Sequence, residues 1–295
     1  MRLRYGMNPH QQATITPLDR PPFAVVSGEA SYINVLDALT GWQLVREASA
    51  RFGVPAAVSY KHVSPAGAAL GASVADAYAR ARDADPKSSY GDFVAVSHPV
   101  DAELAGLLKR VVSDGIIAPG YDEGVVEVLA SKKRGTFLVL EADAEFEPPA
   151  EEVREVYGVR LTQERDALPM PRDLPDDAVL GMIVARYTQS NTVVMVKDGM
   201  TIGVGAGQQS RVDCTRLAGE KAQLWWSRRS SEPLTGVTMI SDGALPFTDN
   251  VEEAQRYGVT HIVEPAGSIR SPEIAAACAA AGITWSPTDL RLFRH

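Results

Sequence analysis

The sequence contains little cysteine: two thiols, Cys214 and Cys278, in 295 residues. Neither lies in a CxxC pair or near a histidine at zinc-ligand spacing, so we expect no disulfide framework and no zinc site. No apolar run approaches the roughly 18 residues that cross a bilayer, and residues 1–6 lack the apolar core of a signal peptide. These absences predict a cytoplasmic protein that does not enter membranes.

Positive charge is also in deficit, because 29 Lys and Arg face 37 Asp and Glu, for a formal net charge of −8. A general nucleic-acid-binding protein needs a basic surface, so we expect no nucleic-acid partner. A small anionic ligand is still compatible, since a few converging arginines and backbone amides can hold it. With 45% hydrophobic and 22% charged residues, the chain is typical of globular proteins.

Helical and strand-like patterns alternate along the chain, which predicts an α/β layered fold. Apolar residues at helical spacing between Ile33 and Val45 precede a short apolar run at residues 55–60. Further along, we expect helices at 66–82 and 101–112 and strands at 93–97 and 115–118.

A polar stretch with five prolines, residues 148–177, predicts an irregular connection between two α/β units. We place the boundary within it, giving units 1–165 and 166–295. The second unit is expected to begin with a helix at 182–188 and a hairpin of strands 193–197 and 201–204 that turns at Asp198-Gly199. Helices at 213–226, 251–257 and 271–281 and strands at 262–264 and 283–285 follow.

Adjacent basic side chains, Lys61 and His62, follow the apolar run in a segment that continues with Pro65 and Gly67. We expect them at a strand end, in a turn before a helix, where α/β proteins place ligands. There the imidazole can accept a proton near neutral pH and the ammonium can stabilise negative charge. The alternative is an ordinary solvated pair.

A glycine-dense segment, residues 203–211, is predicted to form a turn between a strand and a helix that begins near Ser210 and Arg211. Such a turn can bring backbone amides and an arginine close to an anion, but tight packing explains the glycines equally well. It is neither the GxGxxG dinucleotide fingerprint nor a phosphate loop ending in GK[ST]. The C-terminal residues 291–295 combine bulky apolar and basic side chains, which predicts that they dock onto the fold.

Taken together, nine ordered segments resemble the aminoimidazole carboxamide ribonucleotide (AICAR) transformylase domain of the bifunctional purine-synthesis family, whose other domain is an inosine monophosphate (IMP) cyclohydrolase. The segments are residues 3–11, 61–67, 88–92, 113–115, 187–191, 205–211, 215–219, 246–250 and 290–293. The resemblance implies transfer of a formyl group from 10-formyltetrahydrofolate to the 5-amino group of AICAR, giving FAICAR in purine biosynthesis.

The resemblance implies three catalytic residues. His62 would accept the proton of the attacking amine, Lys61 would stabilise the tetrahedral species and protonate the departing folate nitrogen, and Asn191 would align the reacting groups. Residues implied to bind the nucleotide are Arg4, Tyr5, Gly91, Asp114, Ser210, Arg211, Arg291 and Phe293. Residues implied to line the folate site are Lys87, Ser88, Tyr90, Pro246, Asp249 and Asn250.

The family fold implied by the resemblance consists of two cytidine-deaminase-like α/β units in three layers, α/β/α, without their zinc. It forms homodimers in which both subunits build each site. The resemblance also implies a structural potassium ion held by oxygens around Val184, Thr188, Ser190, Asp242 and Leu292. Hard cations prefer such carbonyl, hydroxyl and carboxylate ligands.

The chain departs from this family in three ways. No cyclohydrolase segment precedes Arg2, so a separate protein is expected to close the ring. Only residues 227–240 stand where the family carries a long helical segment, and Ala244 replaces a large aromatic that usually stacks near the substrate base. These departures leave open a formyltransferase for a related amino-heterocycle, or a non-catalytic nucleotide-binding protein. A zinc-dependent deaminase is a third alternative, by fold analogy alone.

Overall fold

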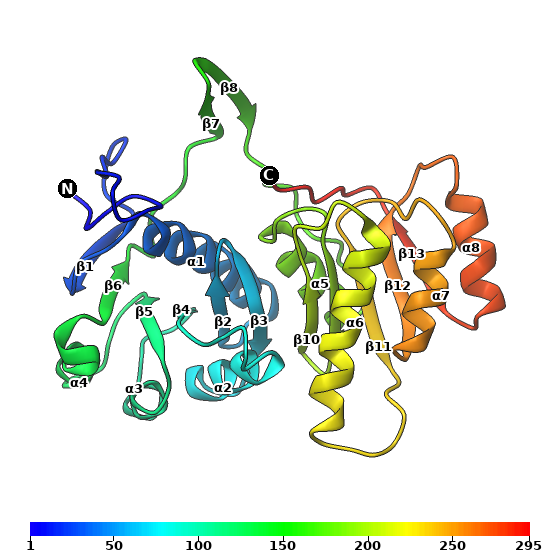
Figure 1. The fold of residues 1–295 in the computed structure, drawn as a ribbon, viewed down its shortest axis with the longest axis horizontal. Helices are drawn as coiled ribbons and strands as arrows, with labels where there is room; N and C mark the ends of the chain where they lie inside the picture. Colours follow the sequence, from blue (N-terminus) through cyan, green and yellow to red (C-terminus); the bar gives the residue numbers. More distant parts are fainter.

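The computed structural model describes all residues 1–295. Its strands are β1 (Phe23–Ser27), β2 (Ala56–Lys61), β3 (Ser64–Leu70), β4 (Asp92–Val96), β5 (Ser113–Ala118), β6 (Leu138–Ala142), β7 (Glu151–Val156), β8 (Val159–Glu164), β9 (Val193–Lys197), β10 (Met200–Gly205), β11 (Val237–Ser241), β12 (Val259–Pro265) and β13 (Thr284–Thr288). Eleven of them form one mixed sheet in the order β1-β6-β5-β4-β2-β3-β10-β9-β11-β12-β13 (Figure 1). The predicted α/β class is confirmed.

Helices cover both faces of this sheet. One face carries α1 (Tyr32–Phe52) and α5 (Asp176–Arg186); the other carries α2 (Val74–Ala84), α3 (Ala102–Lys109), α4 (Val125–Ala130), α6 (Arg211–Ser227), α7 (Asp249–Arg256) and α8 (Ser271–Ala280). A short 3₁₀ turn, η1 (Lys132–Gly135), follows α4. None of these helices is both long and apolar enough to cross a bilayer.

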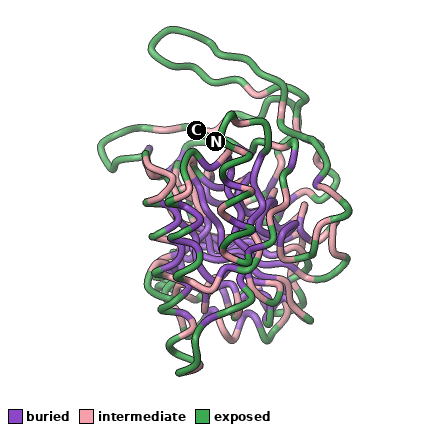
Figure 2. The backbone as a smooth tube through the Cα atoms, turned by 90° about the vertical axis from the view of Figure 1, so that its right-hand side faces the viewer, coloured by how far each residue is buried: buried purple, intermediate pink, exposed green.

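Alternation along the strands divides the interior into two apolar cores. In β9, Val193 and Met195 pack into the core beneath α2 and α6, while Val194 and Val196 pack into the core beneath α1 and α5. Figure 2 shows buried backbone concentrated in the middle of the molecule and exposed backbone around it. The fold therefore has the predicted three layers, helix, sheet and helix.

Helix α1 begins and ends at clear sequence signals. Ser31 caps it by accepting a hydrogen bond from Asn34 N, and the Asn34 side chain accepts from Ser31 N, which forms a capping box. Gly53, with φ of 71°, ends the helix in the left-handed conformation. Its buried face also carries one carboxylate, that of Asp37, among apolar side chains.

The two halves of the sheet meet at β3 and β10, which pair only briefly. Met200 lies opposite Ala69, and Leu70 N donates to Gly199 O at 2.9 Å. The Thr201 hydroxyl then accepts from Ala68 N at 2.9 Å, where a regular ladder would use a backbone carbonyl. Beyond Thr201 no backbone pair joins the strands, so the start of β3 and the end of β10 separate. The predicted boundary at residues 165 and 166 falls between β8 and α5, and the division into two subdomains stays a prediction.

The helix predicted at 66–82 is wrong in its first half. Residues 64–70 form the central strand β3, and α2 begins only at Val74, capped by Ser73. Small residues serve close packing here rather than helix formation, since a Cβ on Gly67 would lie 2.2 Å from the Ala81 carbonyl oxygen of α2. Alanine-rich composition was thus a poor guide to the secondary structure.

The stretch 148–177 was predicted to be irregular. This is wrong for part of it, because β7 and β8 form a hairpin there. Tyr157 and Gly158, both with positive φ, make the two-residue turn. The strands lie between the proline clusters, so the prolines bound the hairpin without breaking it. It projects from the body of the molecule (Figure 1).

Most other predicted elements are confirmed with shifted ends. The β9–β10 hairpin turns at Asp198 and Gly199, which have φ of 54° and 74°. The helix expected at 182–188 instead covers Asp176–Arg186. The C-terminal residues dock as predicted, because Ser190 N donates to Arg294 O at 2.9 Å and Arg294 N donates to the Ser190 hydroxyl at 3.0 Å.

Candidate functional site

Lys61 and His62 lie at the tip of the β2–β3 hairpin. Lys61 pairs with Ser64, so the connecting loop consists of His62 and Val63 alone, with φ of 54° and 59°. The expectation that this turn leads into a helix is wrong: it leads into strand β3. Both residues of a two-residue hairpin loop commonly need positive φ, which explains the backbone conformation.

A cavity of about 300 Å³ lies where β3 and β10 separate, and Lys61 and His62 line it. Its walls come from both halves of the sheet and from α6. The lining residues are Lys61, His62, Ser64, Pro65, Ala66, Ser88, Val204, Ala206, Leu217 and Lys221. Polar and charged side chains thus make up about half of the lining, and small-molecule sites use such groups to orient a ligand.

The turn between α2 and β4 supplies one polar edge of this cavity. Lys61 Nζ donates a hydrogen bond to the Tyr90 carbonyl oxygen. Asp85 accepts from the Ser88 backbone and hydroxyl at 2.9 and 2.6 Å and pairs with Lys221 of α6 at 3.2 Å. Burial raises the pKa of Asp85, but these hydrogen bonds and Lys221 hold it below its usual value. The segment is therefore fixed to both halves of the fold.

A buried polar network lies behind Lys61. The Ser59 hydroxyl donates to Asp92 at 2.7 Å, and Asp92 pairs with Arg82 at 3.0 Å. Burial raises the pKa of Asp92, while hydrogen bonds from Ser113 and Ser59 act in the opposite direction. Because these partners come from β2, β5 and α2, the network fixes β4 and the turn preceding it.

Asn191, Arg211 and Asp242 form a second polar group. Arg211 Nη2 donates to Asn191 Oδ1 and to Asp242 Oδ1, each at 2.9 Å. Asn191 Nδ2 donates to the carbonyls of Gln208 and Gln209 at 2.9 and 3.1 Å. Ser210 stands at the N-cap of α6. Arg211 Nε is buried without a protein partner, which leaves one donor of the guanidinium uncommitted.

The structure distinguishes the two explanations for the glycines of residues 203–211, a turn beside an anion and tight packing. A Cβ on Gly203 would lie 2.0 Å from Ala218 O, and one on Gly205 would lie 2.1 Å from Cys214 O. These two glycines permit close packing of β10 against α6. Only Gly207, with φ of 67°, is required by the turn itself.

The C-terminal segment brings two predicted nucleotide-binding residues beside Arg211. The Phe293 ring lies 4.8 Å from the Arg291 guanidinium and 5.8 Å from that of Arg211. Two arginines from distant parts of the sequence therefore flank one aromatic ring. Guanidinium groups are suited to bind a phosphate.

The residues expected around potassium also lie together. The Thr188 hydroxyl donates to Val184 O at 2.6 Å, the Ser190 hydroxyl donates to Asp242 Oδ2 at 2.6 Å, and Leu292 N donates to Asp242 O at 2.9 Å. Their oxygens are of the types that a hard cation accepts. Nowhere in the chain are three His, Cys, Asp or Glu side chains grouped to hold a metal ion.

The other residues predicted to bind the nucleotide lie near the start of α1 and at strands β4 and β5. Arg4 donates to the Tyr5 hydroxyl at 3.0 Å, and Tyr5 O accepts from Tyr32 N at the first residue of α1. Gly91, with φ of 75°, donates from its backbone to Val112 O, and Asp114 pairs with Lys133. No hydrogen bond or ion pair joins these four residues to Arg211 or Arg291 within the chain.

The predicted folate residues separate into two groups. Ser88 lines the cavity and Tyr90 accepts from Lys61, and Lys87 belongs to the same turn. Pro246, Asp249 and Asn250 lie around the start of α7, outside the cavity lining. The Asn250 side chain is buried, accepting from the Thr215 hydroxyl and donating to Asp249.

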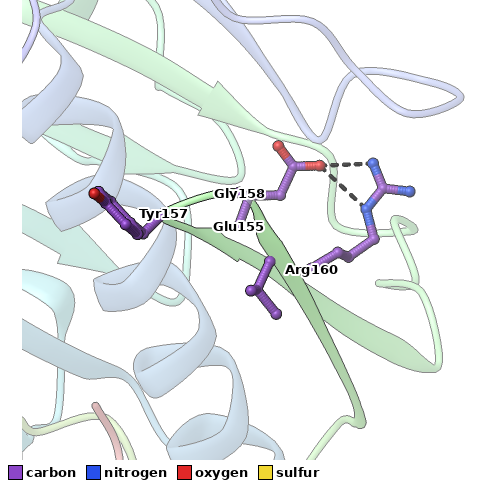
Figure 3. Close-up of a pocket in the computed structure, with 5 residues that line it drawn as sticks. Glu155, Tyr157, Gly158 and Arg160 are labelled. Carbon is purple, nitrogen blue, oxygen red and sulfur yellow. Dashed lines mark hydrogen bonds and ion pairs between the residues drawn. The ribbon is translucent and has the colours of Figure 1, made fainter.

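A larger hollow of about 450 Å³ lies against the tip of the β7–β8 hairpin and has different chemistry. Figure 3 shows Glu155 and Arg160 paired there, with Tyr157 apart from them. Every lining residue belongs to this one exposed hairpin, so a ligand there would remain in water. We therefore place the candidate site at the cavity between β3 and β10.

The sequence analysis missed Asp37, which contacts the turn formed by His62 and Val63. Its Oδ1 accepts from Val63 N at 2.7 Å, and the residue is 5% exposed. Burial raises the pKa of this carboxyl to about 6, although the Val63 amide and His62 act to lower it. A carboxylate on the apolar face of a predicted helix was the available signal.

Comparison with known proteins relates this chain to one family. The sequence profile of the family described as "AICARFT/IMPCHase bienzyme" matches residues 1–221. The chain is 38% identical over 314 aligned positions to the "Bifunctional purine biosynthesis protein PurH" of Cereibacter sphaeroides and 37% identical to that of Dinoroseobacter shibae. In both cases the alignment covers 99% of this chain and 59% of the relative. The alignment is longer than this chain, so the relatives carry residues that this chain lacks.

Proposed function

The chain belongs to the AICARFT/IMPCHase bienzyme family, and we propose that it transfers a formyl group from 10-formyltetrahydrofolate to the 5-amino group of AICAR, giving FAICAR. Because the chain spans 59% of the relatives' length, the proposal concerns the formyl-transfer reaction alone. The observation that carries the proposal is the cavity lined by both Lys61 and His62.

In the proposed reaction, the amine attacks the formyl carbon while His62 accepts its proton. The carbon–nitrogen bond to the folate then breaks, and the folate nitrogen leaves with a proton supplied by Lys61. Lys61 uses one ammonium donor on Tyr90 O, so two donors are left for the tetrahedral oxygen and the leaving nitrogen. General acid–base catalysis of this type contributes about 10²–10⁴-fold in rate.

The phosphate of AICAR would lie near Arg211, Arg291 and Phe293, with Ser210 at the start of α6. An anion at a helix start is favoured by free backbone amides as well as by the arginines. Asn191 would orient the carboxamide. Its side chain already bonds Arg211 and the carbonyls of Gln208 and Gln209, which supports an aligning role through a fixed loop.

Arg4, Tyr5, Gly91 and Asp114 lack links to these arginines within one chain. A homodimer in which two chains share each site would bring such separated groups to one ligand, and we include it in the proposal. The same reasoning applies to Pro246, Asp249 and Asn250 as folate contacts. Potassium held by the oxygens around Asp242 would stabilise the loop that carries Ser190. A cytoplasmic location completes the proposal.

One assay tests the proposal: purified protein is incubated with AICAR and either 10-formyltetrahydrofolate or formate, and FAICAR is followed by mass spectrometry. We expect product with the folate donor. The same assay is repeated with other aminoimidazoles in place of AICAR. If they form product as fast as AICAR does, the result would instead favour a formyltransferase for a related amino-heterocycle, for which Ala244 is the supporting feature. Calorimetry that detects AICAR binding but no folate binding would favour a non-catalytic nucleotide-binding protein.

A further inference from the structure

The turn that presents His62 is built from residues that such a turn disfavours. Two-residue hairpin loops with positive φ at both positions usually contain Asn, Asp or Gly. Here they are His62 and Val63, at φ of 54° and 59°. A β-branched residue in this region is an outlier, because its side chain crowds the backbone. The turn therefore needs stabilisation from outside the hairpin.

Asp37 of α1 supplies that stabilisation. Its Oδ1 accepts a hydrogen bond from Val63 N at 2.7 Å, so the amide of the most strained residue is satisfied by a side chain from another layer of the fold. Asp37 makes no ion pair with any Lys or Arg, although it is only 5% exposed. A buried carboxylate without a basic partner is unfavourable unless another interaction requires it.

The groups that act most on the Asp37 carboxyl are the Val63 amide and the imidazole and backbone of His62, with the charge of Asp114 acting in the opposite direction. The Asp37 charge acts in turn on the phenol of Tyr60. Burial raises the pKa of the Asp37 carboxyl to about 6, so it is mostly ionised at pH 7. A charge is thus kept in a nearly dry position directly beneath the turn.

We infer that Asp37 is a positioning residue, which holds the His62-Val63 turn in its left-handed conformation and thereby presents the imidazole of His62 to the cavity. This inference rests on the proposed role of His62 in formyl transfer. Asp37 acts through the backbone of its neighbour and takes no proton from the substrate.

The first test compares Asp37→Ala with Asp37→Asn. Alanine removes the acceptor for Val63 N, whereas the asparagine side chain keeps an oxygen in its place. We expect alanine to lower kcat by about 10- to 100-fold, the loss that small misplacement of a catalytic group produces. KM for AICAR should change little, and asparagine should restore most of kcat. A matched control is Glu47→Gln, which removes another partly buried carboxylate of α1, one bonded to Arg186 and Tyr187, and should leave kcat near wild type.

The second test removes the strain itself. Glycine adopts positive φ freely, so Val63→Gly should let the turn form without Asp37. In the Asp37→Ala background, we expect Val63→Gly to recover much of the lost kcat. If alanine lowers kcat only through general damage to the core, glycine at this position will restore nothing, and that result would overturn the inference. Equal kcat loss in the alanine and asparagine variants would overturn it too.

A third measurement separates this inference from the proposed reaction. Amide hydrogen exchange of Val63, followed by NMR, reports the turn directly and needs no turnover. We expect strong protection in wild type and in Asp37→Asn, and fast exchange in Asp37→Ala. If the wild-type protein forms no FAICAR while this exchange pattern holds, the proposed function fails and the structural role of Asp37 stands. Unchanged protection in Asp37→Ala refutes the role whatever the activity.

Discussion

Arg211 Nη2 donates a hydrogen bond to Asn191 Oδ1 at 2.9 Å, and the same nitrogen contacts Asp242 at 2.9 Å. These contacts connect the start of α6 to the residues just before β9 and just after β11. Asp242 is fully buried, and this guanidinium is its ion-pair partner. The guanidinium serves a third partner as well, because Nη1 donates to the Ala244 carbonyl at 3.3 Å.

Arg211→Lys should therefore lower the stability of the protein although charge is conserved. Lysine has one nitrogen where arginine has Nη1 and Nη2, so at least one of the three partners loses its donor, a loss of about 1–3 kcal/mol. Urea unfolding measures the change in the free energy of unfolding. Arg216→Lys, on the exposed side of α6 where Arg216 pairs with Asp213, is the control, with an expected change below about 0.5 kcal/mol. Equal effects of the two substitutions would contradict the argument.

His62→Ala should abolish most turnover while the fold and nucleotide binding persist. The substitution removes a proton acceptor from a cavity wall, so kcat should fall by about 10²–10⁴-fold. Calorimetry with AICAR should give nearly unchanged affinity. His98→Ala is the matched control, because His98 is exposed and contacts Ser97. A near-normal kcat in His62→Ala would refute the catalytic assignment.

Arg291→Ala should weaken AICAR binding more than it lowers kcat. Losing one charge-assisted contact to a phosphate corresponds to about 1.5–3 kcal/mol, or roughly a 10- to 100-fold rise in Kd. Added salt should weaken wild-type binding in the same direction, since Arg291 is exposed and salt screens its charge. Arg256→Ala, on the exposed surface of α7, should leave Kd unchanged. An Arg291 variant that binds AICAR normally would remove the C-terminal segment from the phosphate site.

Asp37 predicts a specific dependence of stability on pH. Its carboxyl has a pKa of about 6 in the fold against 3.8 as the ordinary value, chiefly because burial disfavours the charge. Between these values the unfolded chain loses its proton first, so the free energy of unfolding falls as pH rises from about 4 to 6 and then levels. The difference amounts to about 3 kcal/mol. Asp37→Asn should remove this fall, and urea unfolding across pH 4–7 measures it. The same slope in both proteins would show that Asp37 does not titrate in this way.

Gly205→Ala should destabilise the fold by crowding α6 against β10. The added methyl would lie 2.1 Å from Cys214 O, so α6 must shift away from β10. Overpacking of this kind lowers the free energy of unfolding by about 1–3 kcal/mol. Gly106→Ala is the control: its Cβ meets open space in α3, and alanine should stabilise the helix by about 0.5–1 kcal/mol. If Gly205→Ala is neutral, close packing does not explain the glycine.

Much of the fold was predictable because local pattern and tertiary role agreed. The alternation of helices and strands and the Asp198-Gly199 hairpin both follow from residue chemistry. The failures occurred where tertiary packing overrides composition. Residues 66–70 are small because α2 lies directly on β3, and the same small residues favour helix when read in isolation.

The sequence indicated candidate site residues but not where each would lie. Lys61, His62 and Ser88 line the cavity, whereas Arg211, Arg291, Pro246, Asp249 and Asn250 do not. Asp37 escaped notice since its partner, Val63 N, is a backbone group that no side-chain pattern reveals. Contacts between distant backbone and side chains cannot be read from spacing along one segment.

Strands β3 and β10 pair only at Met200 and Ala69 before they separate. A chain emerging from the ribosome carries Lys61 and His62 long before Val204, Ala206 and Leu217 are synthesised. Until the later residues fold against the first sheet half, the two basic side chains face water without an opposite wall. The cavity is therefore completed only once Leu217 and Lys221 have been synthesised, and a shorter polypeptide holds Lys61 and His62 without the opposite wall.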